Sequence, residues 1–343
     1  MKFTIIPDKY NSQSYSDKWS ECLIQRGHDI LFSNISDPGL ISKIASSDGF
    51  MWRPSISPDV KQQASRILLI AEKILNKPVF PDFYTFWHYD DKVSQAYLFN
   101  ALNIPTPLTW IFWNKSEALE WATKATYPLV HKLAIGAGST NVRLIKTIGD
   151  AKSQIDQDFR GRFSGSNSVC KNSTVKKRIK HLSEKALYAA KYLIKDSYPP
   201  LPEDFWQPQK NYSYFQEFVP GNEFDTRVTV IGERAFAFRR WNREGDFRAS
   251  GSGRLDYDLA GVDLNYVKLA FEISKLGRFQ SMAYDFLSHN GLPKLGEISY
   301  TFSDRAVFDC PGYWDMDLVW HEGQMWPEEA QVIDFLGKIV NYQ

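Results

Sequence analysis

The segment YPLVHKLAIGAGSTNVRLIK, residues 127–146, holds a loop of small residues between two apolar stretches. Residues 127–133 and 141–146 each have the pattern of a strand, so the loop around Gly136 and Gly138 joins a strand to a strand. Glycine permits positive φ and leaves backbone N–H groups open to an anion. No helix follows, and the lysine–serine ending of a P-loop is missing. The segment therefore predicts a hairpin loop that covers phosphates, with an ordinary turn as the alternative.

Two lysines are expected close to this loop. Lys132 lies in the strand before it, and Lys92 lies near the start of a helix predicted over residues 90–102. An ammonium group at either position can contact the α- and β-phosphates of a nucleotide. The lysines thus turn a generic loop into a candidate phosphate site.

A pair of carboxylates follows more than a hundred residues later. Asp285 and Glu297 lie on strands predicted over residues 279–288 and 293–300, which an Asn-Gly turn joins. Apolar residues flank both acids, and buried carboxylates on neighbouring strands repel each other unless a cation lies between them. Magnesium suits that place because a few carboxylates and substrate phosphates hold it. The alternative is one buried salt bridge and one exposed acid.

A strand end between these features could receive a base. In YFQEFVPGNEFDTRV, residues 214–228, the strand ends near Glu217 and Val219. Backbone N–H and C=O groups at such an end can pair with the edge of an adenine, and Glu223 could take the ribose hydroxyls.

The first 85 residues alternate strand and helix patterns, which predicts a parallel sheet covered by helices. One strong helix is expected over residues 58–75. Arg53 ends a predicted strand and is well placed for a substrate carboxylate. The alternative is a surface arginine stacked on Trp52.

Residues 150–211 differ from the rest of the chain. Apolar residues recur at helical spacing, and residues 171–195 contain eight Lys/Arg and one acid. This pattern indicates either a solvated helix face or a basic face toward a polyanion or a membrane surface. From residue 212 onward the chain becomes rich in strands.

Composition limits the class of protein. The 343 residues suggest two or three compact units, and a net charge of +1 argues against a general polyanion binder such as a nucleic-acid protein. Three distant cysteines make a disulfide framework or zinc site unlikely to form, which fits the cytoplasm. We expect no signal peptide and no membrane span.

The order of these features resembles a known family. A lysine in a helix, PLVHK before a glycine loop, QEFVPG, a D-x-R strand, a basic hairpin and D…E on the last strands follow one another. This order is similar to the ATP-grasp superfamily, and most to carboxylate–amine ligases of the RimK and glutathione-synthetase type. The resemblance covers residues 78–302. It implies an α/β (α+β) chain with an N-terminal parallel domain (1–85), a lid subdomain with the glycine loop (86–211) and a C-terminal subdomain with the metal site (212–343).

The resemblance also implies roles at matching positions. Those that bind ATP would be Lys92, Lys132, Gly136, Gly138, Ser139, Glu217, Val219 and Glu223. Those that meet the transferred phosphate would be Arg227, Arg239 and Arg240. Magnesium ligands would be Asp285, Glu297 and Ser299, although the family usually has asparagine where this chain has Ser299. Substrate would contact Arg53, Arg248, Ser250 and Gly251.

The implied activity is ATP-dependent ligation. A substrate carboxylate takes the γ-phosphate, and an amine attacks the resulting acyl phosphate to give an amide, ADP and phosphate. The substrates would be small molecules, either a sugar acid as in surface-polysaccharide synthesis or an amino acid or peptide, and the protein could be a homodimer. The alternatives are an ATP-dependent phosphotransferase on the same scaffold and a nucleotide-binding regulator that has lost its chemistry.

Overall fold

The computed structural model describes residues 1–8, 15–136, 141–160, 162–163 and 208–342. The basic segment at 171–195 and the loop residues Gly138 and Ser139 lie outside the described residues. None of the described helices is both long and apolar enough to cross a membrane.

The N-terminal unit is built on a parallel sheet, as the alternating pattern predicts. Its strand order is β2-β1-β3-β4. The bounds are β1 Lys2–Ile6, β2 Asp29–Phe32, β3 Gly49–Trp52 and β4 Val79–Phe80. The helices of this unit are α1 Tyr15–Gln25, α2 Leu40–Ala45, α3 Pro58–Leu69 and α4 Phe83–Phe86. A π-helical turn, Ile70–Ile74, continues α3, so the expected helix over 58–75 is present with a changed hydrogen-bond pattern.

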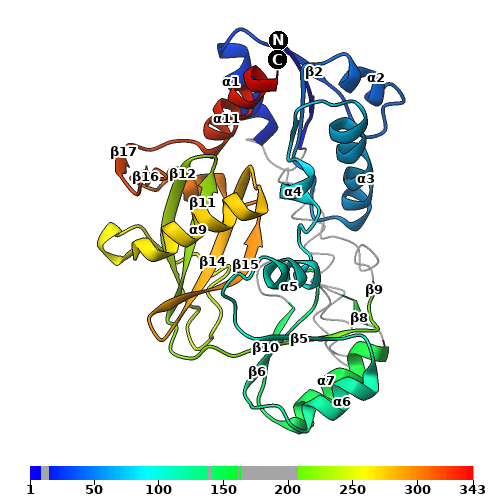
Figure 1. The fold of residues 1–343 in the computed structure, drawn as a ribbon, viewed down its shortest axis with the longest axis vertical. Helices are drawn as coiled ribbons and strands as arrows, with labels where there is room; N and C mark the ends of the chain where they lie inside the picture. Colours follow the sequence, from blue (N-terminus) through cyan, green and yellow to red (C-terminus); the bar gives the residue numbers. More distant parts are fainter. Residues whose placement is uncertain (9–14, 137–140, 161, 164–207, 343) are drawn as a thin grey trace, which may run out of the picture.

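The last helix of the chain completes this first unit. Helix α11, Pro327–Tyr342, packs beside α1, and Phe335 shares a buried cluster with Phe3 and Trp19 (Figure 1). The contact is tight, because a Cβ added at Gly49 would lie 2.9 Å from a ring carbon of Phe335. The two ends of the chain therefore meet in one core.

A second, antiparallel sheet has the order β5-β10-β6-β7. Its strands are β5 Thr109–Phe112, β10 Ser213–Glu217, β6 Leu129–Lys132 and β7 Val142–Ile145. Helices α6, Lys115–Ala122, and α7, Ile148–Arg160, cover one face around buried Phe215. We expected β10 in the C-terminal subdomain that begins at residue 212, but β10 pairs with β5 and β6. The chain leaves this sheet only after Glu217.

The third sheet has the order β15-β14-β11-β12-β16-β17, with β13 beside β12. Its strands are β11 Phe224–Ile231, β12 Arg234–Trp241, β13 Leu255–Asp256, β14 Ser281–His289, β15 Leu292–Ser299, β16 Gly312–Trp314 and β17 Trp320–Glu322. Helix α9, Leu264–Gly277, packs against β11, β12 and β14, and α5, Lys92–Ala101, lies beside β15. Short elements complete the described chain: a 3-10 turn at Leu259–Gly261, α10 at Asp304–Phe308, and the pair β8 Arg162–Phe163 with β9 Pro208–Gln209.

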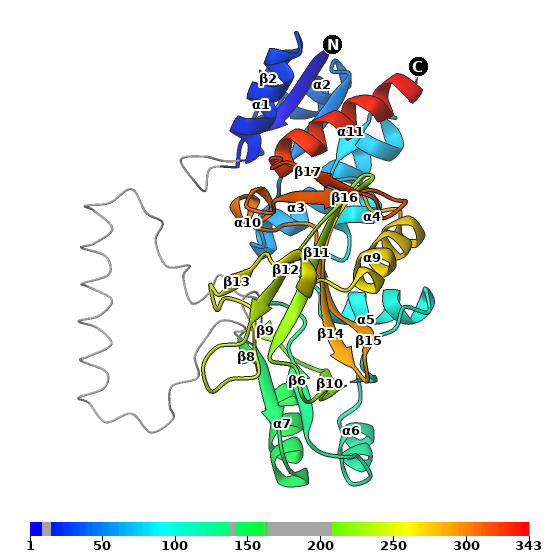
Figure 2. The same cartoon turned by 90° about the vertical axis from the view of Figure 1, so that its left-hand side faces the viewer.

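The three sheets follow one another along the long axis of the molecule. The third sheet lies between the N-terminal unit and the second sheet (Figure 1). The view turned by 90° shows β6 and β10 next to the ends of β14 and β15, with α6 and α7 on the outside (Figure 2). The strand ends of the two antiparallel sheets thus lie close together.

Candidate active site

A cleft that is open to solvent lies between the second and third sheets, and its space, counted out to the open mouth, is about 910 Å³. Strand register gives this cleft two chemically different ends. On β6, Val130 pairs with Gln216 beside the β10 end, and Lys132 lies two residues further along the same face. On β14, Leu287 and Asp285 likewise lie two residues apart, and both line the cleft. The cleft therefore has an apolar end, with Val130, Phe218, Val219 and Leu287, and a charged end, with Lys92, Lys132, Arg240, Asp285 and Glu297.

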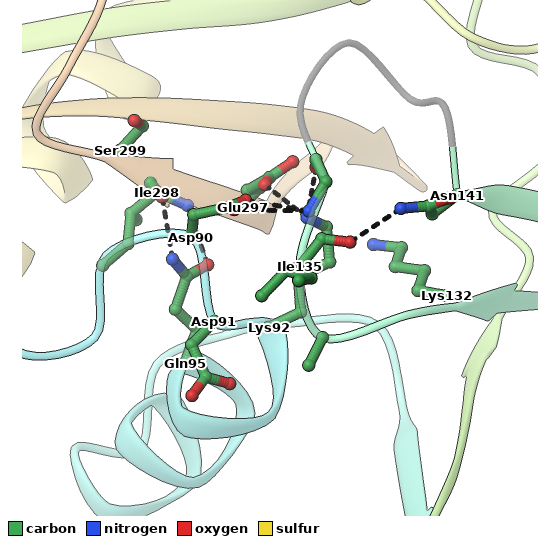
Figure 3. A network of polar contacts seen from close by, with 12 residues as sticks. Asp90, Asp91, Lys92, Gln95, Lys132, Ile135, Asn141, Glu297, Ile298 and Ser299 are labelled. Carbon is green, nitrogen blue, oxygen red and sulfur yellow. Dashed lines mark hydrogen bonds and ion pairs between the residues drawn. The ribbon is translucent and has the colours of Figure 1, made fainter. Parts of the chain in front are cut away.

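Lys92 connects the glycine loop with β15 at the charged end. Its buried Nζ donates to the Gly136 carbonyl at 2.9 Å and lies 2.9 Å from Glu297 Oε1 (Figure 3). Burial alone would lower the pKa of Lys92, but Glu297 and Asp90 hold it above its usual value. The lysine is therefore a fixed cation in the cleft.

The start of the glycine loop is held on both sides. The Gly136 N–H donates to the Asp90 carboxylate at 3.1 Å, and Asn141 Nδ2 donates to the Ile135 carbonyl at 2.9 Å (Figure 3). Gly136 has φ +133°, and a Cβ there would lie 2.4 Å from Asn141 Nδ2. Only glycine fits this position.

Lys132 supplies a second cation with a different environment. Its Nζ donates to Gln216 Oε1 at 2.7 Å, and its side chain points toward the Lys92–Glu297 pair (Figure 3). Burial lowers the pKa of Lys132 to about 8, and the neighbouring charge of Lys92 acts in the same direction while Glu297 opposes it. An anion bound next to this lysine would raise its pKa again.

Asp285 lies in a cluster of alternating charges on β11, β12 and β14. Arg227 donates to both of its oxygens, at 2.7 and 2.8 Å, and Arg240 Nη2 lies 2.7 Å from Oδ2. Arg240 also forms a bidentate pair with buried Asp225, at 2.7 and 2.6 Å. Burial would raise the pKa of Asp285, but the two guanidinium groups hold it well below its usual range. We expected a cation between the carboxylates, and in this structure the arginines of the chain neutralise Asp285.

The carboxylate pair that was predicted to hold magnesium lies at the charged end of the cleft. Asp285 and Glu297 are direct partners in the β14–β15 ladder, and both line the cleft. Among the residues that the structure describes, no group of three or more His, Cys, Asp or Glu side chains could hold a metal ion. Magnesium needs only one or two carboxylates when phosphates and water complete its shell, so the pair fits that ion together with a nucleotide and not a site made of protein alone.

Ser299, the third predicted ligand, is engaged elsewhere. Its hydroxyl donates to the Thr301 carbonyl at 2.8 Å, and it does not line the cleft. Its role as a ligand stays a prediction that requires this hydroxyl to exchange partners.

The strand end at the apolar side of the cleft is braced. The Glu217 N–H donates to the Leu108 carbonyl at 2.8 Å, and the Leu108 N–H donates to Glu217 Oε2 at 3.1 Å. Glu217 and Val219 both line the cleft, whereas Glu223 is exposed and is not part of the lining. Contacts of Glu217 and Val219 with adenine, and of Glu223 with ribose, stay predictions.

The predicted arginines and substrate residues separate into two groups. Arg240, Arg248 and Ser250 line the cleft, and Arg248 is braced by Asp246 at 2.9 Å. Arg239 follows the alternation of β12 onto the opposite face, where it pairs with Asp256 at 2.6 Å. Gly251, with φ +76°, is not part of the lining.

Arg53 belongs to another cavity. It lies after β3 in the N-terminal unit and shares that cavity with Asp8 and Trp52. Among the residues that the structure describes, none lines both this cavity and the cleft.

Three residues of the cleft network were missed from sequence. Asp90 holds Gly136, Gln216 holds Lys132, and Asp225 holds Arg240. The D-x-R pattern contains Asp225, and its position two residues before Arg227 was the signal available. Gln216 belongs to the QEFVPG motif, but no local pattern indicates the partner of Gln216 or of Asp90, because Lys132 and Gly136 lie in distant parts of the sequence.

Comparison with solved structures decides the fold. An ATP-grasp RimK domain protein from Sphaerobacter thermophilus has a TM-score of 0.55 at 12% identity, over 98% of this chain and 99% of that chain. The chain has the ATP-grasp fold. D-alanine–D-alanine ligase from Bacillus anthracis, solved as a complex with ATP, has a TM-score of 0.53 at 10% identity, over 100% and 98% of the two chains. The resemblance inferred from motif order, and the α/β class, are thereby confirmed at the level of fold.

Two further comparisons concern ligases. The ATP-grasp ligase PsnB, solved with its minimal precursor, Mg and ADP, has a TM-score of 0.51 at 13% identity, over 90% of this chain and 92% of that chain. The α-aminoadipate–LysW ligase LysX of Saccharolobus solfataricus is 37% identical over 82 residues, which are 24% of this chain and 30% of that enzyme. The sequence match thus spans less than a third of that relative. No protein-family model matches the chain.

Proposed function

We propose that the protein is an ATP-dependent carboxylate–amine ligase that works with magnesium. The observation that carries the proposal is the pairing of Asp285 with Glu297 across one ladder, opposite Lys92 and Lys132 in a cleft with an apolar far end. A nucleotide has the matching shape, with an apolar ring at one end and a polyanion at the other. Solved proteins of this fold have been observed with ATP or with Mg and ADP.

The charged end can stabilise phosphoryl transfer without an enzyme nucleophile. Lys92 and Lys132 would neutralise the nucleotide phosphates, and Arg240 would contact the phosphate in transfer. Bound magnesium would supply further positive charge at the phosphate oxygens. The remaining contribution of the chain is positioning in a partly dry cleft, where such charges act strongly.

The reaction would proceed in two steps. A carboxylate oxygen of the first substrate attacks the γ-phosphate in line, and the bond to the β-phosphate oxygen breaks to release ADP. The nitrogen of the second substrate attacks the acyl carbon, loses a proton and displaces phosphate, which leaves an amide. Arg248 and Ser250 line the cleft and are proposed to contact the acyl group. A sugar acid and an amino acid or peptide both satisfy this chemistry.

Isotope transfer tests this mechanism. Purified protein is screened for ADP release with ATP, Mg²⁺ and pools of carboxylic acids and amines, and the active acid is then supplied with ¹⁸O in its carboxylate. The account predicts ADP release that requires both substrates, and phosphate that carries one ¹⁸O atom from the acid. A stable phosphorylated acceptor formed without an amine would indicate a phosphotransferase and contradict the proposal.

A matched pair of lysine variants distinguishes the loss of a cation in the cleft from the loss of any lysine. Lys92→Met removes the buried cation next to Glu297, whereas Lys115→Met removes an exposed lysine that pairs with Asp156 outside the cleft. Turnover should fall by about a hundredfold or more for Lys92→Met, as for other preorganised charges at a reacting phosphate. Equal activity of the two variants would remove Lys92 from the proposed site.

A further inference from the structure

A second cavity lies where the parallel strands of the N-terminal unit end. Strands β1, β2 and β3 stop at Ile6, Phe32 and Trp52, and the residues that follow them border a solvent-open cavity of about 930 Å³, counted out to its mouth. In open parallel sheets, ligands bind outside the carboxyl ends of the strands. Arg53 follows β3 directly and faces this cavity.

Arg53 is fixed in position while its hydrogen-bonding capacity stays unused. Its guanidinium carbon lies 4.2 Å from the centre of the Tyr15 ring. Its Nη1 lies 3.8 Å from Asp8 Oδ2, which is too far for a hydrogen bond. Within the described part of the chain the guanidinium donates no hydrogen bond, although the side chain is only 25% exposed. A stacked guanidinium with several unused N–H donors is preorganised for an acceptor from outside the chain.

Asp8 is not the acceptor for the Arg53 guanidinium, because its carboxylate binds the start of α1. Its carboxylate accepts hydrogen bonds from the backbone N–H groups of Tyr15 and Ser16, at 3.3 and 3.0 Å. It is the only other charged residue around the cavity among those described, so the lining is neutral overall. A neutral lining with one guanidinium favours a singly charged planar anion over a phosphate dianion. Apolar side chains, including Ile6, Ile35 and Val60, suit a small hydrocarbon body next to that anion.

We propose that this cavity binds a carboxylate that does not react, carried by one of the two substrates. The proposal rests on the ligase function proposed above. Because none of the described residues lines both the cavity and the cleft, a carboxylate held by Arg53 would not be the one that meets the phosphates. The segment that follows Arg53 contacts the end of β15, the strand that carries Glu297, because Tyr300 donates to the Pro54 carbonyl at 2.8 Å. A substrate anchored at Arg53 would have to reach past this contact to bring its second group to the cleft.

Binding of small fragments tests the cavity without any turnover. Ligand-observed NMR measures isobutyrate, neutral isobutyramide and inorganic phosphate on the full chain, with an unhydrolysable ATP analogue and Mg²⁺ present to fill the cleft. Arg53→Gln is compared with Arg26→Gln, which removes a surface arginine just after α1 that pairs with Glu329. We expect isobutyrate to bind the wild type and Arg26→Gln equally, and Arg53→Gln at least about tenfold more weakly, since a charged hydrogen bond is lost.

Three results would overturn the proposal. They are unchanged isobutyrate binding by Arg53→Gln, isobutyramide binding as tight as isobutyrate, and phosphate binding tighter than either. If thermal unfolding shows that Arg53→Gln is not folded, Arg53→Lys replaces it, because it keeps the charge but loses the planar fork, and we expect intermediate affinity.

The turnover assay then identifies which substrate carries the carboxylate. If the amine substrate does, Arg53→Gln raises KM for amino acids at unchanged kcat and leaves KM for amino-acid amides unaltered. If the acyl substrate does, KM rises for dicarboxylic acids and not for their half-amides. A lower kcat with unaltered KM would contradict an anchoring role. Absence of ligase activity would refute the proposed function. The fragment experiment would still decide whether the cavity at Arg53 binds a carboxylate, because it needs no turnover.

Discussion

Lys92 and Lys132 border the same cleft but differ in how firmly they hold their charge. Lys92 pairs with Glu297, whereas Lys132 contacts the neutral side chain of Gln216. The pKa of Lys92 is therefore raised, and burial lowers that of Lys132 to about 8. Only Lys132 should change its charge near neutral pH.

This difference predicts a pH dependence of ATP binding. Lys132 is protonated below its pKa and neutral above it, so a contact with phosphate is present at lower pH and lost as the pH rises through about 8. ATP affinity should fall by up to about tenfold per pH unit above that value. Calorimetric titration with an ATP analogue measures this. Lys132→Arg keeps its charge and should give a flatter profile, and identical profiles would exclude Lys132 as the titrating group.

The backbone at Gly136 leads to a second prediction. Gly136→Ala places a Cβ against Asn141 at φ +133°, whereas Gly245→Ala meets no atom within 4 Å at φ +68°. Gly136→Ala should lower the free energy of unfolding by about 1–3 kcal/mol, and Gly245→Ala by less. The loss should shrink in an Asn141→Ala background, because the clash is gone while the strained φ remains. Urea denaturation of the variants would contradict this if the two glycines behaved alike.

At the scale of elements, one buried carboxylate ties the second sheet to its helix. Asp158 of α7 accepts hydrogen bonds from Gln154 at 2.7 Å and Ser213 at 2.8 Å, and it lies 3.0 Å from His131 Nε2. Asp158→Ala leaves these buried groups without their partner and should lower the free energy of unfolding by about 3 kcal/mol. Asp156→Ala on the same helix removes only an exposed pair with Lys115 and should cost less than about 1 kcal/mol. Equal losses would contradict a structural role for Asp158.

Local patterns predicted the elements well where each strand carries its own signal. The strands flanking the glycine loop were expected at 127–133 and 141–146 and occur at Leu129–Lys132 and Val142–Ile145. The carboxylate strands around the Asn-Gly turn were predicted equally closely. In both cases a turn motif and the alternation of apolar residues fix the register.

Partners from distant parts of the chain were not predictable in this way. The place of β10 between β5 and β6 depends on residues a hundred positions apart, and no local pattern specifies it. The same holds for Asp285, whose arginine partners come from β11 and β12. The sequence analysis identified two carboxylates and predicted a cation between them, but strand pairing decides which cation they meet.

At the scale of the whole molecule, a bound nucleotide should contact two sheets at once and stabilise the folded state. Residues that line the cleft come from both the second and the third sheet, so ATP with Mg²⁺ would bridge them. At a hundred times its Kd, the complex should raise the free energy of unfolding by about 2.7 kcal/mol. Thermal unfolding with ATP, in Mg²⁺ or in EDTA, measures this gain.

Two glutamate variants, one inside and one outside the cleft, provide the control for that experiment. Glu297→Gln should lose the part of the gain that depends on Mg²⁺, and Glu322→Gln on β17, outside the cleft, should keep it. A gain that is the same in EDTA would remove the metal from the site.

A crystal structure with an unhydrolysable ATP analogue and Mg²⁺ tests the central claim most directly. The account predicts the adenine at the apolar end near Val219 and Leu287, and the phosphates between Lys92, Lys132 and the Asp285–Glu297 pair. Magnesium should contact at least Glu297, and Asp285 should exchange one arginine for the ion. A nucleotide bound elsewhere, or phosphates turned away from Asp285 and Glu297, would contradict the assignment of this cleft as the active site.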